Sequence, residues 1–92
     1  MNKILVIIPT YNEADNILKI IPEVLLNTTE ENDFNILVVD DNSPDGTAAM
    51  GESLNDKKVN VLKREKKLGL GTAYLAGFKY AIKNNYDFVF EN

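Results

Sequence analysis

The chain contains no cysteine and no histidine, and these two absences exclude much of the chemistry open to a small protein. Without cysteine, neither a disulfide framework nor a thiolate metal site is possible. Without histidine, the commonest general base and the commonest zinc ligand are missing. Any chemistry must therefore depend on carboxylates, lysines, hydroxyl groups or a bound metal ion.

Positive charge and long apolar runs are also scarce. Ten basic residues stand against fourteen acidic ones, for a net charge of -4, which argues against nucleic acid as the main partner. The apolar run from Met1 to Ile8 is too short to span a bilayer, and no signal-peptide pattern is present. We expect a soluble, cytoplasmic chain whose 92 residues form one domain, residues 1–92.

Short apolar segments alternate along the chain with segments of helical character. The expected strands are Lys3–Ile8, Ile36–Val39, Val59–Leu62 and Asp87–Phe90; the expected helices start near Asn12 and cover Thr47–Leu54 and Thr72–Asn84. This order predicts an α/β protein with three layers, α/β/α, around a mainly parallel sheet of about four strands. A strand at the end of the chain leaves an open sheet edge, from which we predict self-association.

Several local features follow from residue type. Pro9 is expected to end the first strand, because proline cannot donate to a sheet. Asn12 is a plausible N-cap for the first helix, and Pro22 is expected to kink that helix or divide it. Apolar residues at helical spacing predict the buried face of the last helix: Tyr74, Leu75, Phe78, Ala81 and Ile82.

Polar residues follow the first two expected strands. In a parallel sheet such strand ends meet at one edge, where ligands bind. Asp40 is favoured as a ligand-binding residue, because a carboxylate that closes a buried strand is costly unless something satisfies it. Tyr11 is suited to stack on or bond to a nucleobase, and Glu13 to accept from base or ribose. A simpler alternative is that Asp41 and Asp45 only cap a turn and a helix. Likewise, Glu13 can serve only as a negative charge that interacts favourably with the dipole at the start of the helix.

A basic cluster precedes the Gly69-Leu70-Gly71 segment; its members are Lys63, Arg64, Lys66 and Lys67. Glycines at the start of a helix can cradle a phosphate. The segment lacks the third glycine of a dinucleotide fingerprint, since Tyr74 stands there, and no Gly-Lys-Thr or Gly-Lys-Ser follows. A flexible connection with a solvated charge run explains the segment equally well.

Three stretches together carry a family resemblance: Val-Ile-Ile-Pro-Thr-Tyr-Asn-Glu, Ile-Leu-Val-Val-Asp-Asp-Asn-Ser-Pro-Asp-Gly-Thr and Lys-Leu-Gly-Leu-Gly-Thr-Ala-Tyr. They resemble the nucleotide-binding N-terminal half of an inverting GT-A glycosyltransferase, and most of all the dolichol- or polyprenol-phosphate mannosyltransferase branch. The resemblance implies GDP-mannose as donor, a polyprenol phosphate as acceptor and an intact enzyme at the cytoplasmic face of a membrane. It assigns nucleotide-sugar binding to the positions of Pro9, Tyr11, Glu13, Asp40, Asp41, Arg64 and Lys67.

One departure from the family concerns its metal site. The family continues its fourth strand into an Asp-x-Asp motif that holds Mg²⁺ or Mn²⁺ on the donor diphosphate, whereas here Phe88-Val89-Phe90-Glu91 leads to Asn92 and no such motif follows. We therefore expect no catalytic and no metal-ligating residue in this chain. It is expected to be the nucleotide-sugar-binding part of a longer enzyme and to be inactive alone.

Two other functions are considered. A glycosyltransferase of the same fold with a saccharide acceptor would share these motifs. A receiver-type signalling module is suggested by Ile-Leu-Val-Val-Asp-Asp-Asn, but receivers begin with that strand, whereas here a whole β–α unit precedes it. Receivers also need a phospho-accepting aspartate at a later strand end, and Phe90-Glu91-Asn92 supplies none.

Overall fold

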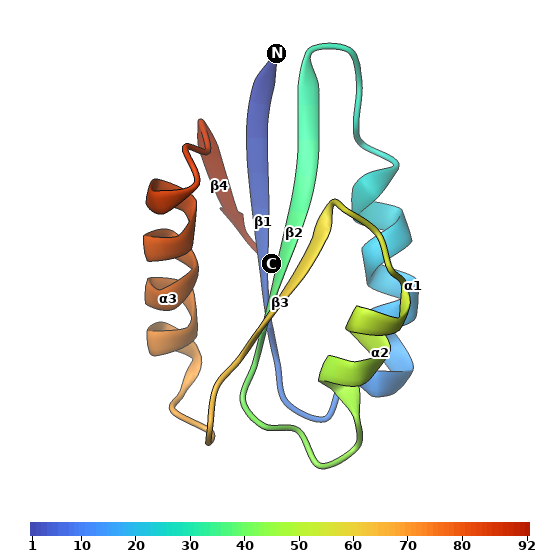
Figure 1. Cartoon of the computed structure of the whole chain (residues 1–92), viewed down its shortest axis with the longest axis vertical. Coiled ribbons are helices and arrows are strands. Elements are labelled where there is room, and N and C mark those ends of the chain that lie inside the picture. Colours follow the sequence, from blue (N-terminus) through green and yellow to red (C-terminus); the bar gives the residue numbers. More distant parts are fainter.

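The computed structural model describes residues 1–92 as a four-stranded parallel sheet with helices on both faces (Figure 1). The elements are β1 (Asn2–Thr10), α1 (Ala14–Leu25), β2 (Asn32–Asp40), α2 (Thr47–Ser53), β3 (Val59–Lys63), α3 (Leu70–Lys83) and β4 (Phe88–Glu91). The strand order is β3-β2-β1-β4 and every neighbouring pair is parallel. Helix α3 covers one face and helices α1 and α2 the other, so the expected α/β/α layers are confirmed. None of the three helices is long and apolar enough to cross a membrane.

The two central strands, β1 and β2, are apolar on both faces, which explains their unbroken hydrophobic runs. Successive side chains point to opposite faces of a sheet. One set therefore packs toward α3: Leu5, Ile7, Leu37 and Val39. The alternate set packs toward α1 and α2: Val6, Ile8, Ile36 and Val38. Both strands thus lie between two layers of helix, and their carboxyl ends reach the same edge of the sheet.

Helix α1 packs on the sheet through Ile17 and Ile21, both essentially buried. The helix runs without interruption through the exposed Pro22, so the prediction that Pro22 divides it is wrong. Pro22 lies only three residues before the helix ends at Leu25, where its missing N–H removes a single bond. The Leu26 N–H still donates to the Pro22 carbonyl at 3.1 Å.

Strand β1 continues through Pro9 to Thr10, so the prediction that Pro9 ends it is also wrong. The Ile7 carbonyl accepts from Asn92, on the β4 side, and the Thr10 carbonyl accepts from Asp41, on the β2 side. By alternation the Pro9 nitrogen faces the β4 side, and β4 ends opposite Ile7. The proline therefore interrupts no sheet hydrogen bond.

Helix α3 buries its smallest residues: Ala73, Gly77 and Ala81. Of the face predicted from apolar spacing, only Ala81 is buried, and Ile82 is 79% exposed. The reason lies in the sheet, whose Ile7 and neighbouring branched side chains already fill this layer. An alanine–glycine stripe lets the helix approach closely. Tyr74 and Tyr80 pack partly buried at the sides of this contact, and Leu75, Phe78 and Ile82 are exposed. The predicted face is therefore wrong for Leu75, Phe78 and Ile82, whereas Ala81 is buried and Tyr74 packs partly buried against the core.

Candidate functional site

The ends of β1 and β2 lie side by side. Thr10 is the register partner of Asp40, so the two following loops start from adjacent positions. Each loop turns at an asparagine with positive φ, Asn12 at 57° and Asn42 at 54°, a conformation that asparagine adopts more readily than most residues. The Asn12 N–H donates to the Ser43 hydroxyl at 2.9 Å and joins the two loops. The predicted meeting of these strand ends is confirmed.

Asp40 is 1% exposed and lies beneath these loops. Its Oδ1 accepts hydrogen bonds from the Thr10 and Ser43 hydroxyls, each at 2.6 Å, and its Oδ2 accepts from the Ser43 N–H at 2.9 Å. We expected a ligand to satisfy this carboxylate, but Thr10 and Ser43 of the protein satisfy it instead. Asp40 lines no pocket, and in this structure it fixes the shape of the two loops.

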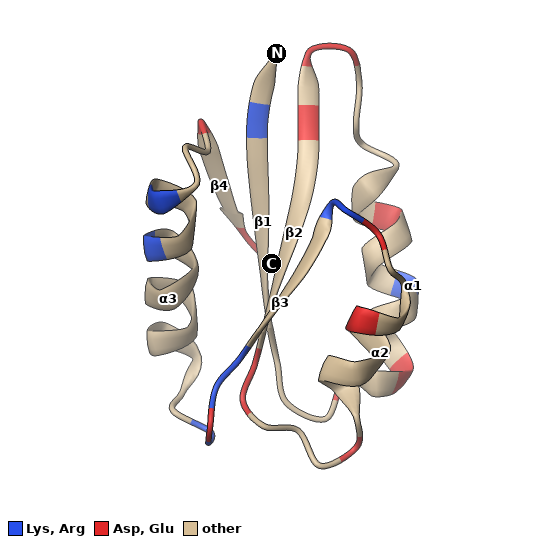
Figure 2. Ribbon diagram, viewed as in Figure 1, with Lys and Arg blue, Asp and Glu red and all other residues tan.

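Asp41 forms a bidentate ion pair with Arg64. The Nε–Oδ1 distance is 2.5 Å and the Nη2–Oδ2 distance is 2.9 Å, and both side chains are largely buried. Figure 2 shows the acidic end of β2 beside the basic end of β3. Burial by itself raises the pKa of Asp41, but the Arg64 guanidinium and the Leu68 N–H together outweigh it and hold the pKa below its ordinary value of 3.8. Asp41 is therefore ionised at neutral pH.

Arg64 also ties the basic loop to the start of α3. Its Nη2 donates to the Gly69 carbonyl at 3.2 Å and its Nη1 to the Thr72 hydroxyl at 3.0 Å. The Asn42 side chain donates to the Glu65 carbonyl at 3.1 Å. Hydrogen bonds thus anchor the segment that precedes the glycine pair at both of its ends.

The start of α1 is capped from a distant loop. Asp45 accepts from the Ala14 N–H at 3.1 Å and from the Thr47 N–H at 3.0 Å. It thus bonds to the first residues of both α1 and α2, although Gly46 occupies the N-cap position of α2. The hydrogen bonds from Thr47 are the main cause of the lowered pKa of Asp45. The Glu13 N–H donates to the Thr47 hydroxyl at 2.9 Å. Glu13, and not Asn12, occupies the N-cap position, so the prediction for Asn12 is wrong.

A pocket of about 220 Å³ opens at this edge of the sheet. Its lining residues are Pro9, Thr10, Tyr11, Glu13, Asp41, Lys67, Gly69, Leu70 and Ala73. Five of the seven residues expected to bind the nucleotide sugar are among them, while Arg64 and Asp40 are not. The Lys67 ammonium lies 4.8 Å from the centre of the Tyr11 ring. An exposed aromatic face, carboxylates and a cation therefore border one cavity, a combination suited to a base, a ribose and a phosphate.

Four of the nine lining residues were not among those expected to bind: Thr10, Gly69, Leu70 and Ala73. Thr10 stands between Pro9 and Tyr11, so its position beside them was a usable signal. Ala73 carries no chemical signal, because it lines the pocket only by being small where α3 meets the sheet. Gly69 had been considered as part of a phosphate cradle, and its positive φ of 99° brings the chain into α3 beside the pocket.

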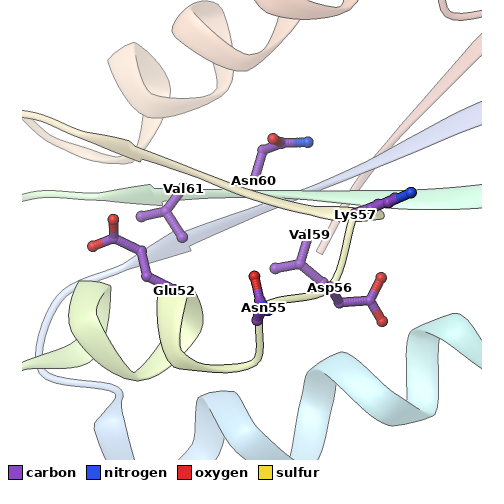
Figure 3. A pocket seen from close by; sticks show the side chains of 7 residues that line it. All are labelled: Glu52, Asn55, Asp56, Lys57, Val59, Asn60 and Val61. Atoms are coloured by element: carbon purple, nitrogen blue, oxygen red, sulfur yellow. The ribbon is translucent and has the colours of Figure 1, made fainter.

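A larger hollow, about 390 Å³, lies at the outer edge of the sheet between α2 and β3. Its lining residues are Glu52, Asn55, Asp56, Lys57, Val59, Asn60 and Val61 (Figure 3). Figure 3 shows Glu52 and Asp56 at opposite ends of the hollow, with their carboxylates pointing apart. None of the expected binding residues borders it, and its polar groups do not converge. The smaller pocket is the better candidate site.

The chain gathers no group of three or more acidic side chains that could hold a metal ion. Asp40 and Asp41 are adjacent in sequence, yet one is bonded within the loops and the other is paired with Arg64. Residues 1–92 therefore do not form by themselves the metal site that the resemblance implies.

The fold is a parallel α/β sheet with helices on both faces, and its pocket lies where two neighbouring strands end. Residues 5–88 match the family described as Glycosyl transferase family 2. The chain belongs to this family, and the expected glycosyltransferase relationship is confirmed. The family match also removes the receiver-type alternative.

Curated relatives cover nearly the whole chain. It is 44% identical over 90 residues to the polyprenol monophosphomannose synthase of Mycolicibacterium smegmatis. This match covers 95% of the chain and 33% of the relative. It is 43% identical over 91 residues to the undecaprenyl-phosphate mannosyltransferase of Micrococcus luteus, covering 97% of the chain and 36% of the relative. The chain thus spans about a third of the length of these relatives.

A solved structure supports the fold assignment. A mannosyltransferase from Pyrobaculum calidifontis, in complex with GDP-Man and Mn²⁺, superposes with a TM-score of 0.69 at 25% identity. The match covers 85% of this chain and 24% of that one. The expected α/β architecture of a GT-A fold is confirmed.

Proposed function

We propose that residues 1–92 form a single nucleotide-sugar-binding domain whose ligand is GDP-mannose. The observation that carries this proposal is the pocket between the ends of β1 and β2, which Pro9, Tyr11, Glu13, Asp41 and Lys67 border together. The mannosyltransferase activities of the relatives and the GDP-Man bound to the Pyrobaculum enzyme support the choice of ligand.

Four of the pocket residues have a chemical role in nucleotide-sugar binding. Tyr11, 40% exposed, offers a ring on which the base stacks. Glu13 accepts hydrogen bonds from the ribose hydroxyls or the base. Lys67 carries the positive charge that the diphosphate requires. Asp41 faces the pocket with its charge held by Arg64.

For a longer protein that carries this chain, we propose transfer of mannose from GDP-mannose to a polyprenol phosphate at the cytoplasmic face of a membrane. The acceptor phosphate is already an anion, so a direct displacement at the anomeric carbon requires no strong general base. This agrees with a chain without histidine. Mg²⁺ or Mn²⁺ would stabilise the leaving diphosphate through ligands that lie outside residues 1–92.

Calorimetry with GDP and Mn²⁺ tests binding by the 92-residue chain. We expect weak binding, detectable at about millimolar ligand. Tyr11→Ala should weaken it about tenfold, because stacking on one aromatic ring contributes about 1–3 kcal/mol per base. Phe78→Ala is the control, since Phe78 is 36% exposed and lies on α3, outside the pocket.

No heat with millimolar GDP would contradict the proposal, as would equal losses in the two variants. A transfer assay with radiolabelled GDP-mannose and polyprenol phosphate should give no product with this chain alone. Labelled lipid in that assay would show that residues 1–92 suffice for catalysis and that the expected inactivity is wrong.

We also propose that the chain self-associates through β4. This edge strand has a neighbour on one side only, and its Phe88 and Phe90 are each about half exposed. An unpaired, apolar edge favours pairing with another chain. Sedimentation velocity should show a concentration-dependent dimer that Phe90→Lys disperses. A single monomeric species at high concentration would contradict the proposal.

A further inference from the structure

We infer that Arg64 is a positioning residue that holds the basic loop in place, so that Lys67 faces Tyr11 across the pocket, and that Arg64 itself does not contact the nucleotide. The part of this inference that concerns the ligand rests on the proposed function. The part that concerns the loop stands without it. This role differs from the direct binding role that the family resemblance suggests for Arg64.

The hydrogen bonds of the guanidinium are used inside the protein. Nε and Nη2 donate to the two carboxylate oxygens of Asp41, Nη2 also donates to the Gly69 carbonyl, and Nη1 donates to the Thr72 hydroxyl. The side chain is 11% exposed, and Arg64 does not line the pocket. A guanidinium has five N–H donors in a rigid fork. With these bonds formed, it has little left to offer a ligand on the far side of Asp41.

The partners of Arg64 belong to three segments that meet at the pocket. Asp41 directly follows the last residue of β2, Gly69 is the last residue of the basic loop, and Thr72 lies in the first turn of α3. The Leu68 N–H also donates to Asp41, at 3.2 Å. Lys67 lies between Arg64 and Leu68 in the sequence, and both of these residues donate to Asp41. The Lys67 ammonium lies 4.8 Å from the Tyr11 ring centre. Arg64 therefore sets the pocket wall indirectly, through the loop that carries Lys67.

Amide hydrogen exchange on the ligand-free chain tests the loop directly. Arg64→Ala should speed exchange at Leu68 about tenfold or more relative to Val38, a core amide that reports global unfolding. Arg64→Lys should give an intermediate rate, because lysine retains the charge but lacks the bidentate fork. Lys63→Ala is the matched control, since the exposed Lys63 pairs with Glu52 and not with this network. Should Arg64→Ala not fold, Arg64→Lys carries the test.

A double-mutant cycle on GDP affinity separates positioning from direct binding. Lys67→Ala and Arg64→Ala should each weaken GDP binding about tenfold. In the Lys67→Ala background, Arg64→Ala should then have less than about a twofold effect, because a residue that acts through Lys67 has nothing left to position.

Two results would overturn the inference. One is an unchanged exchange ratio of Leu68 to Val38 in both Arg64 variants. The other is additive losses of GDP affinity in the cycle, which would show that Arg64 acts on the nucleotide by a route other than the placement of Lys67. If the unsubstituted chain binds no GDP, the proposed function fails, and the exchange experiment still decides the structural part.

Discussion

Replacing Gly77 by alanine is expected to destabilise the chain by about 2 kcal/mol, although alanine is the better helix former. Gly77 is buried in α3 and faces Ile7 of β1. A Cβ at this position would lie 2.7 Å from Ile7 Cγ1 and 2.9 Å from Ile7 Cγ2, and it would also clash with Cδ1. Ile7 is fully buried in a central strand, so neither side can yield cheaply. Urea unfolding followed by circular dichroism measures the loss.

Gly71→Ala in the same helix is the matched control. Nothing lies within 4 Å of a Cβ at Gly71, so only the helix propensity changes there. We expect Gly71→Ala to be neutral or to stabilise by up to about 1 kcal/mol. Equal effects of the two substitutions would show that α3 does not rest on Ile7 through Gly77.

Replacing Asp40 by alanine is expected to cost about 3 kcal/mol of folding stability, the largest effect that we predict for a polar residue. The substitution removes the acceptor of three hydrogen bonds from Thr10 and Ser43 at a position that is 1% exposed. Two hydroxyls and one N–H would lose their partner, and the loops after β1 and β2 would lose their common anchor. Chemical denaturation measures the change.

Asp40→Asn is expected to cost much less, about 1 kcal/mol. The amide group can face the Thr10 and Ser43 hydroxyls while its oxygen accepts from the Ser43 N–H, so the number of bonds is kept. Asp15→Ala controls for the change in charge, because Asp15 lies exposed in the first turn of α1. Stability of Asp40→Ala within about 0.5 kcal/mol of the Asp15 control would contradict a structural role for Asp40.

The neighbouring residues Asp40 and Asp41 have different roles in the site. The Asp40 carboxylate accepts hydrogen bonds only from the ends and loops of β1 and β2, whereas Asp41 borders the pocket and is paired with Arg64. The two residues have adjacent positions but opposite environments, because successive residues at a strand end point to different sides. Loss of Asp40 should therefore appear first as instability, and loss of Arg64 first as a misplaced loop.

Much of the fold followed from the sequence alone. The unbroken apolar runs in β1 and β2 predicted strands covered on both faces, and the β–α alternation predicted a parallel sheet. Because parallel strands end at one edge, the meeting of the Tyr11 and Asp40 loops was also predictable. The observed elements differ from the expected ones mainly at their ends, as with β2, which begins at Asn32 and not at Ile36.

Other features were decided only by the tertiary structure. Apolar spacing could not show that α3 would bury Ala73, Gly77 and Ala81, because that choice depends on how much space the sheet leaves beneath the helix. The same holds for Pro9, whose nitrogen happens to face the side on which β4 has already ended.

The partners of the polar residues lay equally beyond the sequence. Asp45 caps a helix whose first residue is Ala14, and Arg64 pairs with Asp41, 23 positions away. Residue types and spacings therefore determined the layers, the sheet and the edge at which the site forms. Packing decided which carboxylate is hydrogen-bonded inside the protein and which one borders the pocket. Hydrogen bonds form only between groups that the completed fold brings within reach.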